Sequence, residues 1–411
     1  DAISRGVPSV VVSAGAVAAT LMAVAIATCS IVFSEPAAAD ALMLGAIIAV
    51  PVLGAAAWGR HAAAGLTGWV IVVATGLFAC GWSATPGSAI THQLVTLFLA
   101  LGAFTVAGFV AKDPIPRARL VLLAYAASCI IAAAAAFAGY FRLLPGAFEL
   151  FTNFGRARGT FKDPNVLGAA LVMRLAFGTW EVFRARPGRI VPGAALSLVC
   201  ALAILISFSR GAWFAAIVAC GLVVWFCAAT SRRATDVRRL TTASMAGCFA
   251  LALGAATQIE AVRTLLSERA SMDQSYDQGP EGRFGGQAKA RALIIDNPLG
   301  IGTHTFRERH HHEEPHNVYL STFLNSGWLG GLTYIVLVLA TAAVGIKGSV
   351  RNGHLQMAYV VATATFVALS LEGFVIDTDH WRHVFIPMGL IWGLADAEHR
   401  AATRATRKAT P

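Results

Sequence analysis

The sequence predicts an all-helical, polytopic integral membrane protein. Of its 411 residues, 56% are hydrophobic and only 13% are charged, which is about half the charged share of an ordinary soluble domain. Apolar runs of about 20 residues recur from end to end, and each is long enough to cross a hydrocarbon layer of roughly 30 Å. We therefore expect a single membrane domain over residues 1–411.

The apolar runs predict about twelve transmembrane helices. The first run resembles a signal peptide, but its length of about 25 residues exceeds a typical h-region, so we expect a retained span. The expected spans are 7–33, 40–58, 64–82, 90–111, 118–140, 164–183, 189–207, 211–230, 240–258, 317–346, 355–376 and 382–397.

Basic residues are concentrated in the short loops on one side of these spans, for example as four arginines within 231–239. The positive-inside rule makes this side cytoplasmic. Both ends of the chain then face the cytoplasm, with a basic tail at 398–411, and two long loops, 141–163 and 259–315, lie on the outer side. A net charge of +10 on a polytopic chain first reflects arginines in the cytoplasmic loops, so we expect no nucleic-acid partner.

The second long loop contains a predicted amphipathic helix over 282–296, which Asn297 and Pro298 end. Arg283, Gln287 and Arg291 repeat every four residues on one face, and apolar side chains line another. Such a helix can lie along the membrane with its basic face toward anionic head groups, so membrane lipids are expected partners.

The loop also contains the letters H-E-x-x-H, from His312 to His316. A zinc protease needs both histidines on one helical face, but Pro315 prevents a helix across them. Adventitious metal binding by the run His310 to His312 is an alternative. The seven cysteines, within or beside apolar runs, show neither a disulfide framework nor zinc-finger spacing. We therefore predict no metal site and no cofactor.

His316 lies where the second long loop re-enters the membrane. A neutral imidazole with a pKa near ambient pH can take a proton from a sugar hydroxyl, which makes His316 a candidate catalytic base. The alternative is an interfacial histidine that only anchors the end of the helix. The residues alone leave both interpretations open.

Three arginines, Arg158, Arg210 and Arg283, lie on the outer side with His316. Guanidinium groups bind phosphate oxygens bidentately, as a lipid-linked diphosphate requires. Each arginine taken alone is instead explained by snorkelling or by binding of lipid head groups, and only together with a histidine do they form a coherent site. Asp377 and Asp379, in the last outer turn, either orient an arginine or histidine or belong to an ordinary polar turn.

At these residues the chain resembles the superfamily of O-antigen ligases and O-antigen polymerases. The matching pieces, in order, are R-G-T-F-K-D-P-N at 158–165, S-F-S-R-G at 207–211, G-R-F and N-P-L-G-I-G within 282–302, P-H-N-V-Y-L at 315–320 with the downstream G-W-L-G-G, and D-T-D-H-W-R-H at 377–383. The first five spans match only in hydrophobicity.

The resemblance implies a GT-C-like fold and metal-independent transfer of a glycan from undecaprenyl diphosphate to an acceptor hydroxyl, on the periplasmic side of the bacterial inner membrane. It makes His316 the base and Arg158, Arg210 and Arg283 the donor-binding arginines. Family members often have an aromatic residue after the loop arginine where this chain has Gly285, Gly286 and Gln287, so Arg291 is an alternative to Arg283. Asn317, Asp377 and Asp379 complete the predicted substrate-binding set.

The expected acceptor depends on the branch of the superfamily. It is the lipid A core in a ligase, another glycan chain in a polymerase of O-antigen or exopolysaccharide, and a protein hydroxyl in an O-oligosaccharyltransferase. A more remote alternative is a transporter of lipid-linked sugars. Transporters usually place ionisable or helix-breaking residues near the midplane. Arg174 is the only clear mid-span charge in this sequence, which argues against transport.

Overall fold

A computed structural model describes residues 13–184, 187–230, 279 and 282–409 of the chain. It is helical throughout these residues except for loops and one two-stranded hairpin. Each predicted span within the described residues corresponds to a helix, whereas span 240–258 and residues 259–278 of the second long loop lie outside them. Apart from this hairpin, the secondary structure of the described residues is therefore helical.

Six of the described helices are long and apolar enough to cross a membrane. They include, in chain order, α3 (Arg60–Ala79) with the following turn η1 (Cys80–Trp82), α4 (Pro86–Lys112), α5 (Pro114–Tyr140), α7 (Pro164–Arg184), α9 (Arg210–Ala229) and α14 (Val318–Ser349). Shorter apolar helices are α1 (Ala14–Ala27), α2 (Ala38–Val52), the main part of α8 (Pro187–Ile206) and α15 (Gln356–Glu372). This is the composition of a multi-pass membrane protein.

The remaining elements are short or amphipathic. They are α6 (Ala147–Phe151), the antiparallel strands β1 (Thr152–Asn153) and β2 (Arg156–Ala157), α12 (Arg283–Asp296), α13 (Thr305–Arg309) and α16 (Arg382–Ala409). The last helix continues through the segment that we expected to be a separate tail from 398 onward, because no proline or glycine interrupts it after Gly393.

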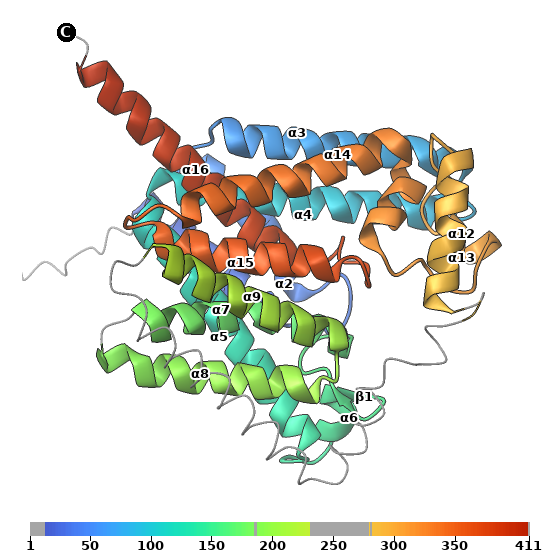
Figure 1. Cartoon of the computed structure of the whole chain (residues 1–411), viewed down its shortest axis with the longest axis horizontal. Coiled ribbons are helices and arrows are strands. Elements are labelled where there is room, and N and C mark those ends of the chain that lie inside the picture. The colour runs from blue at the N-terminus through green and yellow to red at the C-terminus, as the bar shows by residue number, and fades with distance from the viewer. Residues whose placement is uncertain (1–12, 185–186, 231–278, 280–281, 410–411) are drawn as a thin grey trace, which may run out of the picture.

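The long helices run side by side along the longest axis of the molecule (Figure 1). Helix α3 packs on α14, α4 packs on α16, and α7 packs on α8 and α9. Figure 1 also shows α6 and the hairpin at the same end of the bundle as α12 and α13, and the C-terminal part of α16 projecting from the other end. The described parts of the two long loops thus lie at the same end of the helices.

Prolines start several of the helices. Pro86, Pro114, Pro164 and Pro187 are the first residues of α4, α5, α7 and α8. The first turn of a helix does not use its N–H groups for internal hydrogen bonds, and proline already has the helical φ, so this position favours proline. These starts are consequently set by the local sequence.

The start of α3 is instead stabilised from a distant helix. The buried carboxylate of Asp396, in α16, accepts hydrogen bonds from the N–H groups of Gly59, His61 and Ala62 at 2.9, 2.9 and 3.1 Å. A carboxylate at a helix N-terminus satisfies the otherwise unbonded N–H groups and interacts favourably with the helix dipole. Asp396 therefore ties α16 to α3.

Glycines allow α16 to approach α4 closely. A Cβ atom on Gly389 would lie 2.4 Å from the carbonyl oxygen of Ala103, and one on Gly393 would lie 2.5 Å from that of Ala107. Both pairs are four residues apart, so a stripe of small residues on each helix faces the other. This is the small-xxx-small packing that membrane helices use.

The bend in α14 brings the G-W-L-G-G segment into contact with the N-P-L-G-I-G segment. Gly327 has φ +66° and ψ −171° inside the helix, and a Cβ there would lie 2.6 Å from the carbonyl oxygen of Pro298. The N–H of Trp328 donates to that same oxygen at 2.8 Å, and the N–H of Ile301 donates to the carbonyl of Leu324 at 2.7 Å. The N-P-L-G-I-G segment thus packs directly on the bend and places the loop before α14.

The mid-span arginine is paired within its own helix. Arg174 Nη2 lies 3.1 Å from Glu181 Oε2, and the Arg174 side chain is only 2% exposed. The guanidinium also lies over the ring of Phe177. This charge therefore has an ion-pair partner inside the bundle.

Candidate active site

His316 lies at the junction between the second long loop and α14. Its φ is +50°, in the left-handed region that few residues other than glycine adopt. The next residue, Asn317, caps α14 by accepting hydrogen bonds from the N–H groups of Tyr319 and Leu320 at 3.1 and 3.2 Å. The turn and the cap together hold the imidazole, which is 33% exposed, at the start of the helix.

Two carboxylates flank this imidazole. His316 Nε2 is 3.3 Å from Glu313 Oε2, and His316 Nδ1 is 3.8 Å from Asp377 Oδ2. Glu313 is more than half exposed, whereas Asp377 accepts a hydrogen bond of 2.6 Å from Ser321 Oγ. Burial raises the pKa of Asp377 to about 7, and the nearby charge of Asp379 adds to this rise. The imidazole thus lies between the exposed carboxylate of Glu313 and the carboxylate of Asp377, which a hydrogen bond from Ser321 holds in place.

The elements around His316 are joined through Phe374, in the turn between α15 and α16. The carbonyl of Phe374 accepts hydrogen bonds from Asn317 Nδ2 at 3.0 Å and from Gln287 Nε2 at 3.3 Å. Gln287 Nε2 also donates to the carbonyl of His316 at 3.5 Å. These bonds connect α12, the start of α14 and the turn that carries Asp377.

The orientation of α12 differs from our expectation. Gln287 was expected on the face turned to head groups, but it is only 4% exposed because its amide bonds the two carbonyls just described. The exposed face instead includes Phe284 and Ile295, which are 56% and 71% exposed. Helix α12 therefore presents apolar side chains outward at the end of the bundle where both long loops lie.

Arg283 acts electrostatically on His316. Burial lowers the pKa of His316 below its ordinary value, and the positive charge of Arg283 lowers it further, against the opposing effect of Glu313. The imidazole is consequently neutral at neutral pH, which is the form that accepts a proton. Of the predicted arginines, Arg283 is the one whose charge bears on this pKa.

Arg158 and Arg291 are placed differently. Arg158 donates from Nε and Nη2 to the carbonyl of Leu150 at 3.3 and 3.1 Å, and Arg291 is exposed on α12. In the described part of the chain, neither side chain is hydrogen-bonded or ion-paired to His316. The structure therefore does not join these two arginines directly to the histidine.

The two motifs around Arg158 and Arg210 are joined by an arginine that we did not single out. Arg156 donates from Nε to the carbonyl of Ser207 at 2.8 Å and from Nη2 to Asn165 Oδ1 at 2.8 Å. Ser207 and Asn165 belong to the S-F-S-R-G and R-G-T-F-K-D-P-N segments. Arg210 is the first residue of α9, directly after this junction.

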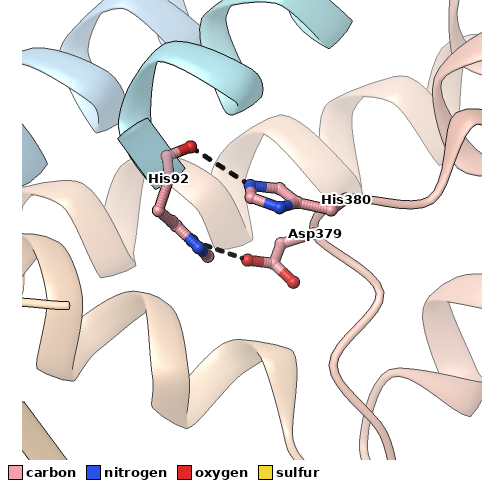
Figure 2. A group of neighbouring side chains, drawn as sticks. All are labelled: His92, Asp379 and His380. Carbon is pink, nitrogen blue, oxygen red and sulfur yellow. Dashed lines mark hydrogen bonds and ion pairs between the residues drawn. The ribbon is translucent and has the colours of Figure 1, made fainter. Parts of the chain in front are cut away.

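A second polar cluster consists of His92, Asp379 and His380, which Figure 2 shows side by side. Asp379 Oδ2 lies 3.0 Å from His92 Nε2, and His380 Nε2 lies 3.2 Å from the carbonyl oxygen of His92. Burial lowers the pKa of His380 to about 4. Burial alone would raise the pKa of Asp379, but His380 and His92 together lower it below its ordinary value. Within the described residues, the three candidate metal ligands are therefore the neutral imidazole of His380, the ionised carboxylate of Asp379 and the imidazole of His92.

No motif in the sequence indicated this cluster. His92 lies near the start of the predicted span 90–111, and Asp379 belongs to the last outer turn, so they are far apart in the chain. The sequence left open whether Asp379 orients an arginine or histidine or belongs to an ordinary polar turn, and in the structure Asp379 lies beside His92 of α4. The ring of His304 also lies edge-on to His92, with centroids 5.4 Å apart.

The H-E-x-x-H letters form no helical pair. Residues 311–317 lie outside any helix, and α14 begins only at Val318. His311 stacks on Phe306, with ring centroids 5.8 Å apart, while His316 is turned toward Asp377. Pro315 has the expected effect, because it precedes the helix instead of lying inside it.

Part of the chain is similar to a known protein family. Residues 194–335 match the family model described as O-antigen ligase. The match covers about a third of the chain, from α8 into α14, and includes Arg210, Arg283 and His316. No curated protein matches the chain. Over residues 194–335 the chain is therefore similar to the O-antigen ligase family, which supports the resemblance to the O-antigen ligase and polymerase superfamily.

Proposed function

We propose that this protein transfers a glycan from an undecaprenyl-diphosphate-linked donor to an acceptor hydroxyl, on the periplasmic side of the bacterial inner membrane. The family match supports glycan transfer of the O-antigen ligase or polymerase type in general. The observation that carries the more specific proposal is the setting of His316, which lies beside Asp377 and within the electrostatic influence of Arg283.

His316 acts as the general base in this proposal. In this scheme Asp377, which lies 3.8 Å from Nδ1, moves closer and accepts the Nδ1 proton. Nε2 can then accept the proton of the acceptor hydroxyl once the exposed Glu313 side chain, 3.3 Å from Nε2, moves aside. The hydroxyl oxygen then forms a bond to the anomeric carbon of the donor sugar, and the bond from that carbon to the diphosphate oxygen breaks. The proton remains on His316 until the product leaves, and the electron pair leaves with the diphosphate.

Arginines hold the leaving group. Arg283 is the donor-binding arginine whose charge lowers the pKa of the base. Arg158 and Arg210 complete the donor site when the diphosphate binds. Positive charge placed where the leaving group gains negative charge lowers the barrier. The transfer is metal-independent in this scheme, because the arginines supply the charge that a cation would otherwise provide.

The membrane supports the reaction by positioning both substrates. The exposed apolar face of α12, with Phe284 and Ile295, fits a helix lying at the membrane surface. Donor and acceptor that are both lipid-anchored would meet there, and holding two reactants in place accounts for much of the rate of a bimolecular reaction. We extend this to a GT-C-like fold of about twelve transmembrane helices with both chain ends in the cytoplasm.

The test replaces His316 by Ala in the native host and analyses extracted lipopolysaccharide on a gel. Loss of the long-chain ladder is expected, since general bases contribute about 10²- to 10⁴-fold to rate. His312→Ala is the matched control, because His312 lies in the same loop. An unchanged ladder in the His316 variant would refute its role as the base.

A gene deletion distinguishes the possible acceptors. Loss of all polymer from lipid A, with polymer still on the lipid carrier, identifies a ligase whose acceptor is the lipid A core. A single capped repeat on lipid A identifies a polymerase. Glycan lost from a protein identifies an O-oligosaccharyltransferase.

A further inference from the structure

We propose that His92, Asp379 and His380 bind a divalent transition-metal ion, with Zn²⁺ as the probe of choice. One ligand atom from each of the three residues lies within 4.8 Å of the other two. Two imidazoles and a carboxylate are a common ligand set for zinc and other first-row ions. None of the three ligands moves a proton or holds the leaving group in the proposed glycan transfer, so the two proposals can fail separately.

The tautomer of His380 favours metal binding. Its Nε2 lies 3.2 Å from the backbone carbonyl oxygen of His92, which can only accept a hydrogen bond, so Nε2 carries the proton. Thr96 Oγ1, 3.0 Å from the same nitrogen, donates its own proton to that carbonyl at 3.1 Å and so accepts from Nε2. The neutral ring therefore keeps its lone pair on Nδ1.

This arrangement matches the outer shell of known metal sites. A metal-ligating histidine almost always donates its other ring N–H to a carbonyl or carboxylate, which fixes the ring and its tautomer. His380 does so through the carbonyl of His92, and that carbonyl belongs to another proposed ligand residue. The main chain of α4 thus orients the ring on the α15–α16 turn.

The ligand atoms lie near the spacing that an ion requires. With bonds of about 2.0–2.2 Å to a tetrahedral ion, ligand atoms lie about 3.3 Å apart. His92 Nε2 and Asp379 Oδ2 are already 3.0 Å apart, and the ligand atom of His380 lies within 4.8 Å of both, so it would move toward them by no more than about 1.5 Å. Ion binding would replace the proton that His92 shares with Asp379, and that proton would be released to solvent.

The site is partly buried and can be reached. The side chains of His92 and Asp379 are 17% and 21% exposed. His380 also lines a cavity of about 240 Å³, together with Lys162 and Asp163. A bound ion would link the first turns of α4 to the α15–α16 turn and so stabilise the turn that carries Asp377.

The experiment measures Zn²⁺ binding to the full chain in detergent, purified without a histidine tag and treated with EDTA. Titration calorimetry should give one ion per chain for the wild type and an affinity at least tenfold weaker for His380→Gln. Glutamine can still donate to the His92 carbonyl but has no imidazole lone pair. Wild type and His380→Gln with equal affinity would overturn the proposal.

A control variant tests the other histidine cluster. The double substitution of His310 and His312 by Ala removes the exposed histidine run, and it should keep the wild-type affinity. Loss of the ion in this variant alone would assign the binding to that run and refute the proposed site.

A second variant covers a failure to fold. Asp379→Asn removes the carboxylate charge at the same site and should show the same loss of affinity. Zn²⁺ should raise the Tm of the wild type by several degrees and leave the Tm of both site variants unchanged. An equal rise in all three proteins would contradict the assignment.

Discussion

Replacing Arg283 by Gln tests both roles that the structure gives this side chain. Arg283 lowers the pKa of His316, and the base works only when neutral, so activity is lost as the pH falls through that pKa. Removing the charge raises the pKa, and the acid limb of the pH–rate profile should therefore move to higher pH, toward the ordinary value.

The size of this shift follows from the partial exposure of His316, whose side chain is 33% exposed. A charge interaction screened by water contributes up to about 1 kcal/mol, and one pKa unit corresponds to about 1.4 kcal/mol. We expect a shift of no more than about 0.7 pH unit. Loss of a charge-assisted hydrogen bond to the donor diphosphate costs about 1.5–3 kcal/mol, which predicts a KM for the donor about 10- to 100-fold higher.

The assay is transfer from a defined undecaprenyl-diphosphate donor by purified protein, followed from pH 5 to 8. Arg291→Gln is the matched control, because Arg291 is exposed on the same helix and is not among the groups that shift the pKa of His316. The acid limb should move in the Arg283 variant only. Equal movement in both variants, or none in the Arg283 variant, would refute the electrostatic reasoning.

Three further predictions concern the turn and the helix packing. Asp377→Asn should lower kcat about tenfold, as for other groups that orient a functional histidine, with the donor KM unchanged; a normal kcat would show that Asp377 does not orient His316. A Cβ on residue 393 would clash with the Ala107 carbonyl, so Gly393→Ala should destabilise the protein by about 1–3 kcal/mol and lower its Tm in detergent. Gly221→Ala is the control, because a Cβ there would have open space, and it should not lower the Tm. Asp396→Asn weakens three hydrogen bonds to the start of α3 and should cost about 1–3 kcal/mol of stability, so an unchanged Tm would contradict this capping role.

The positions of the helices could be predicted because their causes are local. Apolar runs, prolines at helix starts and the cap at Asn317 act within a few residues, and the described helices lie at the predicted spans. Pro315 likewise ruled out a helical metal site without knowledge of the fold. The ninth span, 240–258, lies outside the described residues and stays a prediction.

The face of α12 shows where the local pattern failed. The four-residue repeat of Arg283, Gln287 and Arg291 indicated one polar face, but the helix turns Gln287 inward. Its amide bonds two carbonyls, of His316 and Phe374, and the bonding of buried carbonyls outweighs the preference of an amide for water. Neither carbonyl is visible in the sequence of the helix itself.

The sequence by itself determined that this is a helical membrane protein with polar chemistry in its long loops, because hydrophobicity and helix breaking are properties of neighbouring residues. Only the tertiary structure decided which polar groups meet. It placed Asp377 beside His316 and Asp379 beside His92, through contacts between residues far apart in the chain. Such contacts depend on how the helices pack. The small residues Gly389 and Gly393 allow close packing, but their spacing in the sequence does not show which helix packs against them.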